Sequence, residues 1–413
     1  MVLRQTLAIL GDAYRELNAK KMFWITLALS AFVVLAIACV GINSKGISVL
    51  WWTFPVDVFN TAIVSPALFY KLIFIGFGFK FWLTWAATIL ALISTASLIP
   101  DFVAGGSIDL MLSKPIARLR LFLTKYATGL LFVGLQVMVF SVASFLVIGI
   151  RGGVWDWKIF VAVPLVLLFF SYLYCVCVLI GIVTRSTIAA LLLTVLFWFV
   201  LFLLHSGEQS LNLFKLNAEE QTATLEARAE PLSDQIAKSK AVIAQLSEAP
   251  TDETAEARGR REGELATKNA SLTGLELRQQ STAKDLESYR ASLGRLKLWH
   301  DVLFSVKTAL PKTSETMELL QRVLTSSDET SKLEDAEQQR REERGTRRRD
   351  ADAAKRDADN EADRGGPGFS PSVVRRQEEI NRSRSVWWIL GTSVAFEALV
   401  LAVACTIFVR RDF

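Results

Sequence analysis

Residues 159–183, IFVAVPLVLLFFSYLYCVCVLIGIV, form a long apolar stretch that contains no charged side chain. A hydrocarbon core about 30 Å thick is crossed by an α-helix of about 20 apolar residues. Because no water in that core can satisfy backbone N–H and C=O groups, a helix is the structure expected for such a stretch. Five more apolar stretches of this kind occupy residues 22–40, 81–99, 129–150, 187–204 and 386–409. The sequence therefore predicts an all-α, polytopic membrane helix bundle with six spans.

The charged residues are concentrated between the fifth and sixth spans. Residues 206–385 contain 30 Lys or Arg and 33 Asp or Glu, whereas the rest of the chain contains 16 and 8. The basic excess therefore belongs to the membrane part, where it indicates orientation, and nucleic acid is not an expected partner. All four cysteines fall within predicted spans, which argues against a disulfide framework or a zinc site. These are Cys39, Cys175, Cys177 and Cys405.

The distribution of basic residues orients the predicted spans. With the N-terminus in the cytoplasm, the inner segments hold eleven Lys or Arg and the short outer loops hold five, as the positive-inside rule requires. Both termini are then cytoplasmic, and the charged stretch lies outside. Residues 58–79 are also apolar, and a further crossing there would invert everything that follows. Four residues favour an interfacial or re-entrant segment instead: Pro55, Asp57, Pro66 and Lys71.

Residues 1–21 have the pattern of an amphipathic helix. One apolar stripe at helical spacing is formed by Leu3, Leu7, Leu10, Tyr14 and Leu17. Such a helix lies on the inner membrane surface, or it packs as an ordinary helix on the protein.

Residues 205–385 are predicted to form a helical hairpin outside the membrane. Apolar residues at heptad-like spacing are typical of a coiled-coil seam. They occur on both sides of a break at residues 248–252, so we expect two antiparallel helices, the second ending near Trp299. The seam residues are Leu225, Leu232, Ile236, Ile243, Leu246, Leu265, Leu272, Leu275, Leu286, Leu293 and Leu296. The alternative is a solvated spacer without a partner.

The end of this stretch has two parts of different composition. Residues 302–324 are more apolar, and we expect them to lie back on the membrane or on the spans. Residues 326–370 combine high charge with few large apolar side chains, which predicts disorder.

The chain lacks the common motifs of catalytic sites. It contains no Gly-x-x-x-x-Gly-Lys-Ser/Thr loop, no His-Glu-x-x-His and no Gly-x-Ser-x-Gly. Its two histidines, His205 and His300, end predicted helices and are expected to be structural. We therefore predict that the chain is not an enzyme and that it has no catalytic residue, no metal ligand and no cofactor.

Glu397 is a carboxylate in the middle of the sixth span. A charged group at that depth costs about 2.5–3.5 kcal/mol on insertion scales, so its side chain should face protein or a wet cavity. One interpretation is a residue on a transport pathway, or one that locks helices, with Lys80 or a hydroxyl such as that of Thr84 as its partner. The other is a protonated or hydrogen-bonded carboxylate that only holds helices together.

A short segment between the second and third spans mixes apolar and charged residues. Residues 106–118 read GSIDLMLSKPIAR. Ser107 can cap a helix and Asp109 lies in its first turn, while Pro115 ends it. A short capped helix at the inner face is either a surface anchor or a docking element for a partner.

This segment, followed by Lys125 and Gly129, resembles the coupling helix of ABC-2-type ABC transporter permeases. The subgroup that it resembles most is that of the multi-copper-enzyme maturation and gliding-type permeases. The matching motif there is Gly-x-Ile-x-Leu-Leu-x-x-Pro-x-x-Arg, which docks on a separate ATPase. The resemblance assigns that role here to Gly106, Ile108, Asp109, Leu112, Lys114, Pro115 and Arg118.

The resemblance covers residues 1–204 and 386–413, and the 180-residue insertion departs from the family pattern. It implies an exporter permease in the bacterial inner membrane, with residues 1–21 as an elbow helix. Its partners would be an ABC ATPase subunit that holds ATP and Mg²⁺, a second copy or paralogue of the permease, and membrane lipid. An envelope protein could bind the hairpin. The alternative is a non-transporting scaffold, in which the ATPase moves the hairpin and nothing crosses the membrane.

Overall fold

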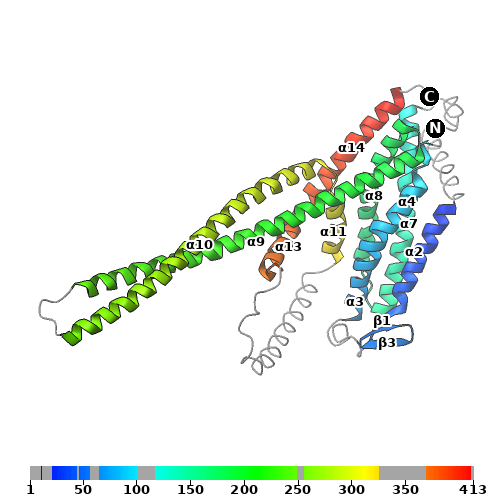
Figure 1. The fold of residues 1–413 in the computed structure, drawn as a ribbon. Coiled ribbons are helices and arrows are strands. Elements are labelled where there is room, and N and C mark those ends of the chain that lie inside the picture. The colour runs from blue at the N-terminus through cyan, green and yellow to red at the C-terminus, as the bar shows by residue number, and fades with distance from the viewer. Residues whose placement is uncertain are drawn as a thin grey trace. The chain divides into compact units, whose positions relative to one another are not determined.

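The computed structural model describes residue 11 and residues 21–43, 46–55, 65–100, 117–248, 255–324 and 369–410. The chain within these residues is almost entirely helical, and six of the helices are long and apolar enough to cross a membrane (Figure 1). They are Lys21–Cys39, Pro66–Pro100, Arg118–Gly152, Trp157–Thr184, Thr187–Ser247 and Val386–Arg410. The predicted all-α bundle with six spans is confirmed, and the chain is a multi-pass membrane protein.

Three predicted features lie outside the described residues, apart from residue 11 and a few residues at their ends. They are the amphipathic helix of residues 1–21, the coupling helix near residues 101–118 and the disorder of residues 326–370.

The chain divides into two compact units. The membrane unit consists of residues 1–205, 307–364 and 384–413, and the hairpin unit consists of residues 206–306 and 365–383. Residues 307–324 belong to the membrane unit and pack with the spans, in agreement with the expectation that residues 302–324 lie back on the membrane or on the spans.

The membrane unit is built around α8 (Ala162–Thr184). It packs against α7 (Arg118–Gly152) and α14 (Val386–Arg410), while α7 also packs against α2 (Lys21–Cys39) (Figure 1). Aromatic and branched side chains of α8 fill the centre of the bundle. Those that are fully buried include Phe169, Phe170, Leu173 and Tyr174.

The second span begins earlier than predicted. Pro66–Pro100 is one helical stretch that contains α3 (Pro66–Ile73), the π-helical η1 (Phe74–Ala87) and α4 (Thr88–Thr95). The described part of the segment predicted to be interfacial or re-entrant, from residue 66 to residue 79, is helical and continuous with the second span.

Local chemistry explains this early start. The Oγ of Ser65 accepts the N–H of Leu68 at 3.3 Å, and Pro66 occupies the first helical position, where its missing N–H costs nothing. Lys71, whose charge had argued against a span, is ion-paired with Asp156 at 2.8 Å. A paired lysine near the end of a helix does not prevent that helix from crossing a membrane.

A small antiparallel sheet follows the first span and was not expected from the sequence. Its strands β1 (Val40–Asn43), β2 (Gly46–Val49) and β3 (Trp52–Pro55) pair in the order β1-β2-β3. The Oη of Tyr70 donates to the carbonyl of Val40 at 2.8 Å and joins the sheet to α3. The apolar residues of these strands had been read as span and loop, because strands of four residues carry little periodicity.

Helix α11 (Thr313–Leu324) lies against the spans. It packs against α8, against η2 (Trp157–Val161) and against α14. Its apolar face is buried and includes Met317, Leu319, Leu320 and Leu324. The apolar end of the insertion thus joins the membrane unit.

The hairpin unit consists mainly of α9 and α10. Helix α9 (Thr187–Ser247) begins as the fifth span and continues without a break, and α10 (Ala255–Ala309) extends beyond the predicted end at Trp299. The two helices run alongside each other in opposite directions (Figure 1). Three ion pairs between the helices agree with this antiparallel arrangement, because the residue number of the α10 partner decreases as that of the α9 partner increases. The pairs are Glu219–Lys297, Glu226–Arg290 and Lys240–Glu276.

Helix α13 (Pro371–Ser383) packs on α9 within the hairpin unit. The buried amide of Asn212 donates to Gln377, and Gln209 is hydrogen-bonded to Gln377 and Asn381. Buried amides that satisfy one another fix the register of α13 on α9.

Candidate functional site

Arg118 is the one described residue of the predicted coupling motif. Gly106, Ile108, Asp109, Leu112, Lys114 and Pro115 lie outside the described residues. Arg118 begins α7, and its Nη1 donates to the carbonyl of Val409 at 3.3 Å, in the last turn of α14. A cation near the C-terminus of a helix is favourable because it meets unsatisfied carbonyl groups. The rings of Phe122 and Phe408 add a second contact, with their centroids 5.4 Å apart.

Glu397 faces the interior of the bundle and is bound by hydroxyls, which was one of the predicted kinds of partner, but the residues that supply them are other than Thr84. Its Oε1 accepts from Tyr126 Oη on α7, and its Oε2 from Ser171 Oγ on α8, both at 2.8 Å. Lys80 is exposed, and the hydroxyl of Thr84 donates to the carbonyl of Phe79 in its own helix. The reason is packing: α14 lies against α8 and α7, whereas η1 lies against α2, α3, α4 and α11.

A buried charged cluster lies at the opposite end of α14 from Arg118. Glu315 on α11, only 2% exposed, forms ion pairs with Lys307 at the end of α10 and with Arg384 Nη1 at 3.4 Å. Nδ1 of His205, on α9, lies 3.6 Å from Oε2 of Glu315. We call Glu315, Lys307, Arg384 and His205 the Glu315 cluster. It joins α9, α10, α11 and the residue pair that precedes α14.

Electrostatics in the Glu315 cluster favours the charged forms. Burial raises the pKa of Glu315, but hydrogen bonding to His205 and the charge of Lys307 outweigh it and hold that pKa far below its ordinary value. Burial lowers the pKa of His205, and hydrogen bonds to Glu315 and Glu318 outweigh that effect and raise the pKa above 6.5. The carboxylate is therefore ionised at neutral pH, and it holds three basic groups together.

Lys312 ties the connection between α10 and α11 to α14. Its backbone N–H donates to Ser393 Oγ at 2.9 Å, and its Nζ donates to Thr392 Oγ1 at 2.6 Å and to the carbonyl of Thr308 at 3.2 Å. The ammonium also lies 4.3 Å from the ring centre of Trp388. Burial lowers the pKa of Lys312 to about 8. These contacts satisfy the buried ammonium of Lys312 with hydroxyl, carbonyl and aromatic groups.

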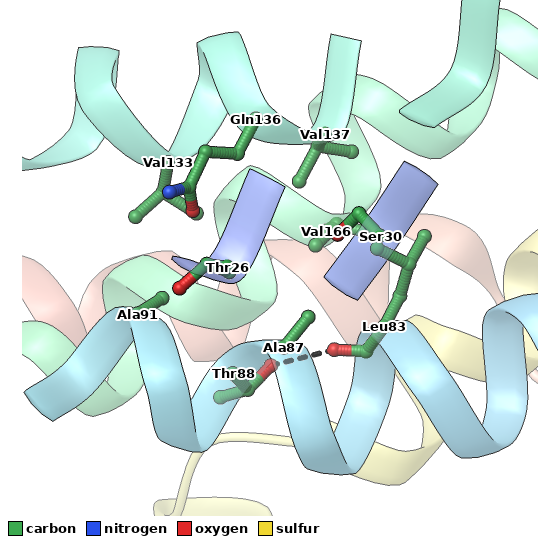
Figure 2. A pocket seen from close by; sticks show the side chains of 10 residues that line it. All are labelled: Thr26, Ser30, Leu83, Ala87, Thr88, Ala91, Val133, Gln136, Val137 and Val166. Atoms are coloured by element: carbon green, nitrogen blue, oxygen red, sulfur yellow. Dashed lines mark hydrogen bonds between the residues drawn. The ribbon is translucent and has the colours of Figure 1, made fainter. Parts of the chain in front are cut away.

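A small polar cavity lies in the bundle between α2, α4, η1, α7 and α8 (Figure 2). The side chain of Gln136 points into it from α7, opposite Thr26 and Thr88, and its Nε2 has no hydrogen-bond partner among the described residues. The hydroxyl of Thr88 is already used, since it donates to the carbonyl of Leu83 at 2.8 Å. The cavity volume is about 10 Å³, which is room for one water molecule at most.

A second small cavity borders the Glu315 cluster. It also measures about 10 Å³, and it is lined by His205, Lys307 and Glu315 together with apolar residues of α9 and of the connection between α10 and α11. A single water that bridges the polar groups is the largest occupant that it can take.

The described residues contain no group of three or more His, Cys, Asp or Glu side chains that could hold a metal ion. The four cysteines are free thiols. His300 lies in the hairpin unit, with its Nε2 3.7 Å from Oε1 of Glu208. Both histidines thus contact carboxylates of neighbouring helices.

Sequence reasoning missed the Glu315 cluster. Its signal was present, because Lys307, Lys312 and Glu315 lie within the apolar residues 302–324, and charges in a segment that packs on spans need partners. The partners Arg384 and His205 are distant in sequence and could not have been identified from spacing alone.

The comparisons with known proteins give no relative for this chain. No family model, no curated protein and no solved structure matches it.

Proposed function

We propose that this chain is the permease subunit of an ABC exporter in a bacterial inner membrane, and that a separate subunit hydrolyses ATP. The resemblance of residues 106–118 to a coupling helix supports this from the sequence. The observation that supports it best in three dimensions is the bond from Arg118, the last residue of that motif, to Val409 of α14. A partner that moves the segment before Arg118 therefore acts on α7 and α14 together.

Helix α14 links the proposed docking region to the connection between α10 and α11. At one end it contacts Arg118, and near its middle Glu397 binds Tyr126 and Ser171. At the other end, Ser393 holds the connection between α10 and α11 through Lys312. Since packed helices and buried polar contacts move as rigid elements, a displacement of α14 reaches α11.

ATP-driven closure of two ATPase subunits would rock the spans between inward-open and outward-open states. ATP and Mg²⁺ would bind to the partner. Under the orientation from the positive-inside rule, both termini are cytoplasmic and the hairpin is extracytoplasmic, where it can recruit an envelope protein.

A second copy or a paralogue completes this arrangement. The fifth span and α14 bury little of their surface within the chain. Their exposed side chains are apolar, so lipid or another permease subunit must cover them. They include Leu192, Leu196, Phe199 and Leu203 on α9, and Val394, Leu399 and Val403 on α14. A cargo path between two subunits at these faces is compatible with the small cavities inside each one.

The second candidate is a mechanotransmitter that carries nothing across the membrane. Two observations favour it: the described cavities have room for water only, and α9 runs as a single helix from the fifth span into the hairpin. In this function the ATPase moves the hairpin, and the hairpin acts on a partner outside.

The joint at Arg118 can be tested with the assembled complex. Arg118→Glu places a carboxylate beside the carbonyl of Val409 and should lower the ATPase activity that co-purifies with the chain by tenfold or more. Arg185→Glu is the matched control, because it reverses an exposed arginine outside the coupling motif. Equal ATPase activity in both variants would contradict coupling through Arg118.

The two candidates differ in what the complex does in sealed vesicles. An exporter hydrolyses ATP faster when its cargo is present, so lipids and amphiphiles from the native membrane should stimulate it. A mechanotransmitter shows no such stimulation, while the distance between spin labels at Leu277 and Ile150, both exposed, changes with each ATP cycle.

A further inference from the structure

Glu397 lies in the middle of the last span. Among the described residues, its side chain takes part in no ion pair, and each of its two oxygens meets one hydroxyl at 2.8 Å. An isolated carboxylate at this depth is unfavourable. The two hydroxyls are therefore what determines whether Glu397 can be charged.

Each of these hydroxyls also has a second acceptor within reach. Tyr126 Oη lies 3.2 Å from the carbonyl of Ser171, and Ser171 Oγ lies 2.8 Å from the carbonyl of Leu168. A hydroxyl carries a single hydrogen, so it donates to one acceptor at a time. Two hydrogens thus serve four acceptors, and the site can distribute them in more than one way.

We propose that Glu397 is a reversible proton-binding site and that Ser171 accepts the hydrogen bond of the bound proton. In the ionised form, both hydroxyls donate to the carboxylate. In the protonated form, the proton comes from water and sits on Oε2, Oε2–H donates to Ser171 Oγ, and the Ser171 hydrogen turns to the carbonyl of Leu168. No bond other than O–H forms or breaks, and no side chain has to change its place.

The hydroxyl of Ser171 is better suited than that of Tyr126 to accept a hydrogen bond from the protonated carboxyl of Glu397. Its alternative acceptor lies at 2.8 Å, whereas that of Tyr126 lies at 3.2 Å, near the limit for a good O–H···O bond. Tyr126 therefore continues to donate to Oε1 in both forms. Its bond is stronger when Glu397 is ionised, because charge-assisted hydrogen bonds are about twice as strong as neutral ones.

Within the part of the chain that the structure describes, the titratable groups that interact with Glu397 are phenols and a thiol. The titratable side chains that interact with it are Tyr126 from α7 and Tyr172 and Cys175 from α8. Phenols and thiols are neutral at and below neutral pH. On the remaining side, Phe396 stacks on Phe197 of α9. Protonation at this point is therefore a single-site event.

This site acts on the helix that joins the two ends of the membrane unit. The ionised form binds α14 to α7 and α8 through two charge-assisted hydrogen bonds, and the protonated form loosens that hold. The inference does not depend on an ATPase partner, so its failure would leave the proposed function untouched.

Infrared difference spectroscopy tests the site directly on the full chain in lipid nanodiscs. Lowering the pH should produce the carbonyl stretch of a protonated carboxyl that disappears in Glu397→Gln and remains in Glu378→Gln, a change at an exposed glutamate of α13. Glutamine has the shape of a protonated glutamate, so the first variant should keep the fold. The absence of a pH-dependent band that is sensitive to Glu397→Gln would overturn the proposal.

Two further variants test the role of each hydroxyl. Tyr126→Phe removes the donor to Oε1 that both forms share, so the carbonyl stretch should shift while the band stays sensitive to Glu397→Gln. Ser171→Ala removes the acceptor of the bound proton, so the carbonyl stretch should move to higher frequency. An unchanged stretch in Ser171→Ala would contradict the geometry proposed here.

Discussion

The backbone N–H of Lys312 donates to Ser393 Oγ at 2.9 Å, across 81 positions of sequence. Both residues are buried, and the bond joins the loop before α11 to the second turn of the last span. A buried N–H that loses its acceptor costs about 1–3 kcal/mol. This contact therefore holds the end of the insertion against the membrane unit.

Replacing Ser393 by alanine should loosen α11. The N–H of Lys312 would be left without an acceptor, and the free energy of local opening should fall by about 1–3 kcal/mol. Amide hydrogen exchange of residues 313–324 measures this, with a tenfold faster rate for each 1.4 kcal/mol at 25 °C. Thr406→Ala, at an exposed position of the same helix, is the control. Equal exchange in both variants would show that the bond does not hold α11.

The Glu315→Gln variant should release α11 more completely. It leaves Lys307 and Arg384 buried without their carboxylate, and removing one partner of a buried ion pair costs about 3–5 kcal/mol. Glu318→Gln is the matched control, because Glu318 lies on the same helix and is 34% exposed. Hydrogen exchange over α11 should rise strongly in the first variant and little in the second. Similar changes in both would mean that burial of Glu315 is not what matters.

The stability of α11 against local opening should decrease both at low pH and at high pH. The pKa of Glu315 is lowered from 4.5, so its contribution is present above pH 4.5 and is lost as the pH falls toward its folded pKa. The pKa of His205 is raised from 6.5, so its contribution is complete below pH 6.5 and is lost as the pH rises through its folded pKa. Protection of α11 is therefore expected to be greatest between about pH 4.5 and 6.5.

A scan of hydrogen exchange between pH 2 and 8, corrected for the intrinsic rate, covers both pH ranges and measures this profile. His205→Gln should abolish the decrease above pH 6.5 and leave the decrease at low pH. A decrease above pH 6.5 that persists in His205→Gln would assign it to another group.

The ion pair of Lys71 with Asp156 should stabilise the start of the second span. Lys71 is only 9% exposed. Burial raises the pKa of Asp156, but the hydrogen bonds to Lys71 and Lys158 outweigh burial and hold that pKa below its ordinary value. Lys71→Met and Asp156→Asn should each destabilise the protein. The double variant should be less destabilised than the sum, by about 0.5–3 kcal/mol of coupling. Thermal unfolding in detergent measures the cycle, and additive effects would show that the pair contributes nothing.

Much of the fold could be predicted from the sequence because lipid imposes a strong constraint. Apolar stretches such as residues 159–183 must be helices in a bilayer, and heptad spacing with a break near residue 250 predicts the hairpin. Strand β2 and its neighbours could not be recognised, since four residues carry too little pattern. The start of the second span was missed because Lys71 appeared unpaired until Asp156 was placed beside it.

The candidate site was predicted in part. The sequence identified Glu397 as a carboxylate that faces protein, since depth in the membrane fixes its cost. Its partners Tyr126 and Ser171 could not be identified from the sequence, because residue spacing along the chain does not tell which helices pack together. Apart from the pair of Lys307 with Glu315, the Glu315 cluster depends in the same way on contacts between residues that are 69 or more positions apart.

The central claim, that this chain is the membrane subunit of an ATP-driven complex, is tested most directly by purification from the native membrane in mild detergent. Mass spectrometry should identify a phosphate-loop ATPase in the complex, and a chain that carries Asp109→Lys with Arg118→Glu should lose it while remaining folded. If no ATPase accompanies the wild-type chain, the ABC assignment is contradicted, and the hairpin's own partner becomes the guide to function.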